Sequence, residues 1–289
     1  MSHPKELFID SFIEEALSGR AKFSEDIIDQ VATDVKDAFK QQLTSGPRGD
    51  FRLRMSNIGR PKCQLWFEKN SPEDREPFEN KFLINMLFGG IIEAVFKGVL
   101  RAAGVPFKNN DKVTLDLGNG TKVRGEYDLV LDNRVDDVKS TTPYGYEKKF
   151  SSFHDLKISD DFGYISQLAG YATASGNEVG GWWIINKQDG RYKYLSANEE
   201  MDVKAEIEKM KETADYLNND MPFERCFEPV PETFSKKLTG NVILHKTCGY
   251  CSFKKKCWPT LQTRDSLLSK AKVKPVVHYI KINTQQEAA

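Results

Sequence analysis

The sequence lacks a net charge, a long apolar run and a secretory signal. Its 42 basic and 42 acidic side chains cancel, so no global field draws the chain onto nucleic acid, and contact with a polyanion must come from local patches. No uninterrupted apolar stretch of about 18 residues occurs, and residues 1–15 are acidic and amphipathic rather than basic and then apolar. We therefore expect a soluble cytoplasmic protein that is not inserted in a membrane.

Two further features narrow the class of protein. No GxxxxGK[ST] loop is present, so the chain has no recognisable phosphate-cradling motor site. The five cysteines are an odd number in a chain without a secretory signal, which argues against a disulfide framework and for a reducing compartment. At 289 residues the chain is long enough for one large core with appendages.

Apolar periodicity predicts a mixture of helices and strands. Spacings of three and four residues indicate helices, and strict alternation indicates strands. The expected helices cover 5–45, 82–100, 164–176 and 198–218. The expected strands cover 113–117, 121–131 and 135–140, with a hairpin over 180–195 and a polar loop over 142–161. This mixture predicts an α/β protein.

The three consecutive strands carry a cluster of acids and a lysine. Side chains two residues apart on a strand point to the same face, so Asp137 and Lys139 share a face while Val138 points into the opposite layer. Asp128, on the neighbouring strand, could share a metal ion with Asp137. Two carboxylates and an ammonium group suit a magnesium-dependent phosphodiester hydrolase. A hairpin edge with solvated charges would show the same pattern.

The apolar helix expected over 82–100 adds a third carboxylate. Glu93 lies among apolar neighbours, and the pair Gly89-Gly90 precedes it. Each glycine costs about 1 kcal/mol of helix propensity against alanine, which is tolerable where a backbone or ligand must come close. Glu93 therefore either lies at a solvated edge or binds a cation.

Three cysteines, Cys248, Cys251 and Cys257, lie within ten residues of one another. Thiolates at this spacing indicate a metal site, which needs a fourth ligand. The candidates for that ligand are Cys63, Cys226 and His245. Zinc would accept four thiolates or three with an imidazole, whereas an iron–sulfur cubane normally takes four thiolates, and spacing alone does not choose between them.

Together these motifs resemble those of the RecB-like branch of the PD-(D/E)xK nuclease superfamily, and more narrowly its iron–sulfur members, over about residues 56–260. The family's motifs occur here in its order: a helical glycine followed by a metal ligand, G-x-x-D, D/E-x-K, Q-x-x-x-Y, and one cysteine upstream of the core with three downstream. The matching residues are Gly89 and Glu93, Gly125 and Asp128, Asp137 and Lys139, Gln167 and Tyr171, and Cys63, Cys248, Cys251 and Cys257. Glu93 departs from the histidine that is common at its position, although related phage-type exonucleases use glutamate there.

The resemblance implies a PD-(D/E)xK core, a mixed central sheet flanked by helices, within residues 51–220. It implies an N-terminal helical region over 1–50 and a cysteine-cluster segment with the C-terminal tail over 221–289. Mg²⁺ or Mn²⁺ would be bound by Glu93, Asp128, Asp137 and the carbonyl group of Val138. Lys139, Gln167 and Tyr171 would complete the catalytic set. The resemblance also favours a structural [4Fe–4S] cluster over zinc, with Cys63 as the fourth ligand and Cys226 as a structural cysteine.

The implied activity is hydrolysis of DNA phosphodiester bonds by an exonuclease acting on single-stranded ends, in phage or prokaryotic recombination, replication or repair. A phage-encoded protein would act in the host cytoplasm. The alternatives are a CRISPR-adaptation nuclease, a DNA-end binding module that does not cut, and a zinc-bearing interaction subunit. A homo-oligomer or a replication or recombination partner is also expected, since relatives form rings. The candidate phosphate contacts are Lys148, Lys149, Lys254, Lys255 and Lys256, although a solvated lysine face would show the same pattern. The aromatic residues Tyr144, Tyr146 and Trp258 could stack on unpaired bases or could equally belong to the core.

Overall fold

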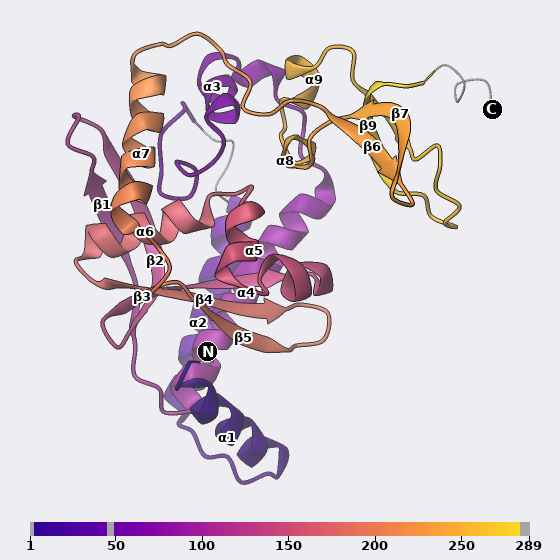
Figure 1. The fold of residues 1–289 in the computed structure, drawn as a ribbon. Helices are drawn as coiled ribbons and strands as arrows, with labels where there is room; N and C mark the ends of the chain where they lie inside the picture. The colour runs from indigo at the N-terminus through magenta and orange to yellow at the C-terminus, as the bar shows by residue number, and fades with distance from the viewer. Residues whose placement is uncertain (1–2, 45–48, 284–289) are drawn as a thin grey trace. The chain divides into compact units, whose positions relative to one another are not determined.

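The computed structural model describes residues 3–44 and 49–283, which form two compact units (Figure 1). The first unit comprises residues 1–59 and 78–215, and the second comprises residues 60–77 and 216–289. The segment 60–77 precedes every strand in the sequence, yet it groups with the C-terminal part of the chain. Each unit is described separately below.

The first unit contains most of the helices. They are α1 (Glu6–Leu17), α2 (Glu25–Thr44), α4 (Asn80–Ala102), α5 (Phe153–Ile158), α6 (Tyr164–Ser175) and α7 (Val203–Asn218), with a short π-helical turn, η2 (Gly145–Lys149). The prediction of a structureless loop over 142–161 was therefore wrong. The Ser152 side chain caps α5 by accepting a hydrogen bond from the N–H of Asp155. A serine at this position can begin a helix even within a polar segment.

A five-stranded mixed sheet forms the centre of the first unit. Its strands are β1 (Lys108–Asp116), β2 (Lys122–Leu131), β3 (Arg134–Thr141), β4 (Glu178–Asn186) and β5 (Tyr192–Ser196), in that spatial order. The pair β3–β4 is parallel, and the other neighbouring pairs are antiparallel. The predicted α/β class, a mixed sheet flanked by helices, is confirmed at this level.

Apolar clusters cover both faces of this sheet. One cluster joins the sheet to α5, α6 and α7, and the other joins it to α1 and α4. The adjacent residues Trp182 and Trp183 on β4 show the alternation, since each is fully buried in a different cluster. A strand buried on both faces needs the nearly continuous apolar sequence that β4 has.

The helix α4 runs alongside α2 and also packs against β3 (Figure 1). A β-carbon added at Gly90 would come within 3.1 Å of Ala38 Cβ, and one added at Gly98 within 2.3 Å of Val31 Cγ2, so both glycines permit the close approach of α2. The same test at Gly89 finds only Ser140 Oγ, at 3.8 Å. The close approach expected at the glycine pair thus holds for Gly90.

By length and composition, α4 is also apolar enough to cross a membrane, and it is the one such helix in the described residues. About 33 % of its most apolar window is buried inside the protein. The buried residues Phe96 and Leu100 belong to the core beneath the sheet. Because the core helices of soluble proteins have the same properties, α4 is weak evidence for a membrane span.

The second unit contains a small sheet and short helices that the periodicity did not predict. The sheet has the order β6-β7-β9-β8, from β6 (Val230–Phe234), β7 (Lys237–Ile243), β9 (Val276–Lys281) and β8 (Gln262–Asp265). The helices are α3 (Lys62–Asn70), the 3₁₀ turn η1 (Pro72–Asp74), α8 (Lys246–Gly249) and α9 (Lys254–Cys257).

Candidate functional site

The strands β2 and β3 place two carboxylates and a lysine in one small region. Lys139 Nζ lies 2.7 Å from Asp137 Oδ1 and 2.5 Å from Asp137 Oδ2. The N–H of Val138 donates to Asp128 Oδ2 at 2.7 Å, which links the two strands beyond their backbone ladder. The Val138 side chain is buried in the cluster on the α4 side of the sheet, as the alternation of the strand predicts.

Asp137 is almost completely buried, at 2 % exposure. Burial raises the pKa of its carboxyl group to about 7. The Lys139 ammonium opposes this effect, and the charges of Asp128 and Glu93 reinforce it. Within the described residues, the one partner of Asp137 Oδ2 is the Lys139 ammonium, at 2.5 Å, which leaves acceptor capacity on this oxygen. A buried carboxylate oxygen with spare acceptor capacity is suited to binding a cation.

Lys139 is half-buried, with 20 % of its side chain exposed, and this partial burial lowers the pKa of its ammonium group. The charges of Asp137 and Asp128 outweigh burial and hold that pKa above its ordinary value. The Tyr164 ring adds a cation–π contact, with Lys139 Nζ 5.1 Å from the ring centroid. In the metal-free protein Lys139 is therefore a fixed positive charge at neutral pH.

Glu93 reaches the same region from α4. Burial raises the pKa of its carboxyl group, the charge of Asp128 raises it further, and the ammonium groups of Lys97 and Lys139 lower it. Lys97 Nζ lies 2.7 Å from Glu93 Oε1, one turn along the helix. Lys97 was missed in the sequence, although the spacing of four residues between an acid and a lysine on an expected helix was a usable signal.

Gln167 and Tyr171 lie one turn apart on α6. Gln167 Nε2 donates to the Tyr171 hydroxyl at 3.2 Å. Burial, followed by the charges of Asp137 and Asp128, raises the pKa of Tyr171 to about 12 despite the bond from Gln167. A β-carbon added at Gly125 would come within 2.7 Å of Tyr171 Cε1, so the glycine of the G-x-x-D motif makes room for this ring.

The structure thus brings all the expected catalytic side chains of the first unit into one electrostatically coupled group. These residues are Glu93, Asp128, Asp137, Lys139, Gln167 and Tyr171. Within the described residues, no group of three or more His, Cys, Asp or Glu side chains stands at metal-binding distances. The chemistry of the donor set, three carboxylates, fits a hard cation such as Mg²⁺ or Mn²⁺.

The residues expected to contact DNA have different surroundings in the structure. Lys149 Nζ lies 4.7 Å from the centroid of the Tyr164 ring, the same ring that Lys139 contacts. Tyr146 belongs to the core, the alternative to base stacking, because its ring is buried there and its hydroxyl donates to the Tyr192 carbonyl. Tyr144 is 76 % exposed. In the second unit, Lys254, Lys255 and Lys256 form ion pairs with Glu76 or Asp74.

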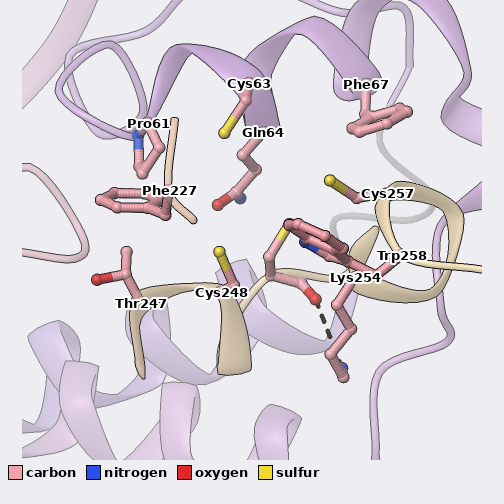
Figure 2. A pocket seen from close by; sticks show the side chains of 11 residues that line it. Pro61, Cys63, Gln64, Phe67, Phe227, Thr247, Cys248, Lys254, Cys257 and Trp258 are labelled. Carbon is pink, nitrogen blue, oxygen red and sulfur yellow. Dashed lines mark hydrogen bonds between the residues drawn. The ribbon is translucent and has the colours of Figure 1, made fainter. Parts of the chain in front are cut away.

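A pocket of about 30 Å³ in the second unit is lined by four cysteines. Cys63 comes from α3, Cys248 from α8 and Cys257 from α9, and their sulfur atoms face the same space (Figure 2). Cys251 also lines this pocket. The volume exceeds the roughly 10–15 Å³ that one water molecule requires. The four cysteines thus line one space, although no three of their thiols stand at metal-binding distances in the described residues. The chemistry of four thiols suits a metal centre.

Cys226 is not among the residues that line this pocket, but it adjoins Cys63. The N–H of Cys63 donates to Cys226 Sγ at 3.2 Å. A hydrogen bond from the Cys63 thiol lowers the pKa of Cys226 to about 7. The same bond and then burial raise the pKa of Cys63, and burial raises that of Cys251 to about 11. Metal binding would therefore release protons from these thiols.

His245, the remaining candidate for the fourth ligand, has a structural role in the metal-free chain. Its Nδ1 atom accepts the N–H of Thr247 at 3.3 Å at the start of α8. Its ring stacks on Phe227 with the centroids 4.7 Å apart. The lining of the pocket thus favours the set Cys63, Cys248, Cys251 and Cys257.

Comparisons with known proteins add little to this site. No family model and no curated protein matches the chain. Among solved structures, one described as "Crystal structure of SSO0001" is 15 % identical in sequence to this chain. The match covers 65 % of this chain and 86 % of that chain at a TM-score of 0.43. A likeness of this size carries no argument about family or activity.

Proposed function

We propose that the protein is a metal-dependent deoxyribonuclease with a PD-(D/E)xK core. The observation that carries this proposal is the coupling of Glu93, Asp128 and Asp137 beside the ammonium of Lys139. The charge of Asp128 raises the pKa of both Glu93 and Asp137, and a bound cation would offset this repulsion. The order of the motifs in the sequence, which resembles that of RecB-like nucleases, supports the same assignment.

Different residues of the chain would have different roles in phosphodiester hydrolysis. Mg²⁺ or Mn²⁺, held by Glu93, Asp128, Asp137 and the Val138 carbonyl, would supply Lewis acidity and an acidified water. Lys139, whose raised pKa keeps it charged, would stabilise the charge that develops on the phosphate rather than remove a proton. Gln167 and Tyr171 would hold the substrate strand or the lysine in place.

The four pocket-lining cysteines would hold a [4Fe–4S] cluster with a structural role, and zinc is the alternative. Four thiolates satisfy either centre. Binding would join α3 to the segment that contains α8 and α9, so part of the binding free energy would stabilise the second unit. Anaerobically purified protein should be brown with a cluster and colourless with zinc.

The proposed substrate is single-stranded DNA degraded from an end in a phage or prokaryotic cytoplasm, with CRISPR adaptation as the alternative pathway. One observation favours a module that binds DNA ends without cutting them. Lys97 holds the position beside Glu93 that a cation would take, at 2.7 Å. The pairing of the buried Asp137 with Lys139 on one face of β3 supports the enzyme instead.

Digestion of end-labelled DNA tests the activity. Anaerobically purified protein would receive single- or double-stranded DNA with Mg²⁺ or Mn²⁺, beside the variants Asp137→Asn and Lys139→Met. Asp132→Asn serves as the control, because this residue lies in the turn between β2 and β3 and its side chain is 57 % exposed. We expect shortening from one end by the wild type and the control only. Binding without cleavage in either metal would support the end-binding module.

A further inference from the structure

The second unit contains a second, open pocket, which adjoins the cysteine pocket and shares Phe67 and Cys257 with it. It has a volume of about 310 Å³, near the lower end of the roughly 300–1,000 Å³ typical of small-ligand pockets. A pocket of this size suits a single nucleotide better than a large cofactor. Its lining combines aromatic rings with two cationic side chains, and includes Trp66, Phe67, Phe223, Arg225 and Lys256.

The aromatic wall is held in place before any ligand binds. The rings of Trp66 and Phe223 lie 5.3 Å apart, and those of Phe67 and Phe223 lie 4.6 Å apart. Trp66 Nε1 donates to the Met221 carbonyl at 2.9 Å, which fixes the indole ring. Trp66 and Phe223 remain half-buried, so they offer ring surface to a flat aromatic group.

A fixed positive charge stands beside this wall. The Arg225 guanidinium lies 4.3 Å from the centroid of the Trp258 ring, and its Nη2 atom donates to the Cys257 carbonyl at 2.8 Å. Within the described residues no carboxylate pairs with Arg225, whereas Lys256 pairs with Asp74 at 2.8 Å. Arg225 also hydrogen-bonds the Cys257 side chain. Since a guanidinium has five N–H donors, Arg225 still retains donors for an anion.

We propose that this pocket binds a nucleotide, with an unpaired base against Trp66 and Phe223 and its phosphate on Arg225. The shared chemistry is a planar base joined to an anion, whether it belongs to a DNA strand or to a free nucleotide. A purely structural role would explain Phe67, which is buried and stacks on Phe253 at 5.5 Å. The structural contacts of Trp66 and Arg225 hold these side chains in place, yet both still line the open pocket together with Phe223.

Equilibrium binding without added divalent metal tests the pocket. The probes are a fluorescent ten-residue thymidine oligonucleotide, measured by anisotropy, and thymidine monophosphate, measured by calorimetry. The variants are Arg225→Gln and Phe223→Leu, with Arg264→Gln as a control that removes one exposed positive charge from β8 of the same unit. Circular dichroism and metal content would verify that each variant keeps its fold and its cysteine site.

We expect Arg225→Gln and Phe223→Leu each to weaken binding at least about fivefold, the lower limit for losing one stacked base. Arg264→Gln should change it less than twofold. Weaker binding of both probes by these variants indicates a nucleotide pocket. Weaker binding of the oligonucleotide alone identifies a DNA strand as the occupant, and the inference then rests on the proposed function. Unchanged binding in either Arg225→Gln or Phe223→Leu overturns the proposal. Because no cleavage is measured, failure of the nuclease assay leaves this test intact.

Discussion

Lys97 and Glu93 form an ion pair within α4, with Lys97 Nζ 2.7 Å from Glu93 Oε1. Only 4 % of the Lys97 side chain is exposed, against 31 % of that of Glu93. Burial and the charge of Asp128 both disfavour the ionised form of Glu93, and Lys97 acts against them. Lys97 thus opposes the rise in the pKa of Glu93 and favours the ionised form that a metal ligand must have.

Removal of either partner of this pair should destabilise the protein. We expect Lys97→Met and Glu93→Gln each to lower the free energy of unfolding by about 1–3 kcal/mol, because each leaves a mostly buried charge without its partner. The double variant should lose less than the sum of the two. Urea unfolding of the four proteins measures this coupling, and strict additivity would show that the two side chains act independently.

Gly125 should resist substitution, whereas Gly89 should tolerate it. In Gly125→Ala the new β-carbon would meet Met55 Cβ at 2.5 Å and Tyr171 Cε1 at 2.7 Å. Such overpacking costs about 1–3 kcal/mol, and displacement of Tyr171 should reduce nuclease activity as well. Gly89→Ala finds open space and should raise helix stability by up to about 1 kcal/mol. Thermal unfolding and DNA digestion compare the two variants, and equal effects would contradict the packing argument.

The cysteine variants should fall into two groups. Serine at Cys63, Cys248, Cys251 or Cys257 should remove most of the bound iron or zinc, since each of these thiols lines the pocket. Cys226→Ser should keep the metal, because Cys226 contacts the backbone of Cys63 and does not line the pocket. Elemental analysis of anaerobically purified protein measures the metal. Loss of metal in Cys226→Ser with retention in Cys63→Ser would reverse the assignment of the fourth ligand.

Asp136 should make stability depend on pH. Burial raises the pKa of its carboxyl group to about 7, although Tyr194, Gly181 and Trp183 all donate hydrogen bonds to it. The ordinary value in an unfolded chain is about 3.9. Between these values the folded state binds more protons, so the contribution of Asp136 to stability is complete below about pH 4. It falls as the pH rises to about 7, by at most about 1.4 kcal/mol per unit.

The variant Asp136→Asn isolates this effect. The amide nitrogen of the variant would face N–H and O–H groups that donate hydrogen bonds to the carboxyl group in the wild type. We therefore expect the free energy of unfolding to fall by about 1–3 kcal/mol at pH 5. The loss should shrink at pH 8, where the wild type carries a buried charge and the variant does not. Urea unfolding at the two pH values, without divalent metal, measures the difference. A loss that grows with pH would contradict the raised pKa.

The sequence by itself predicted the features that depend on residues close to one another along the chain. The alternation in Val135 to Ser140 placed Asp137 and Lys139 on one face of a strand, because strand geometry has a period of two residues. The spacing of Gln167 and Tyr171 placed both on one side of a helix, and the structure shows a hydrogen bond between them. The mixed α/β class followed from the order of such local patterns.

Only the tertiary structure decided what depends on contacts between distant segments. It grouped residues 60–77 with the C-terminal part, which lets Cys63 line the same pocket as Cys248. It paired Glu93 with Lys97, and it buried Asp136. It also paired Lys256, which the sequence suggested as a phosphate contact, with Asp74. Burial and long-range pairing arise from the packing of whole elements, and no local period of the sequence encodes them.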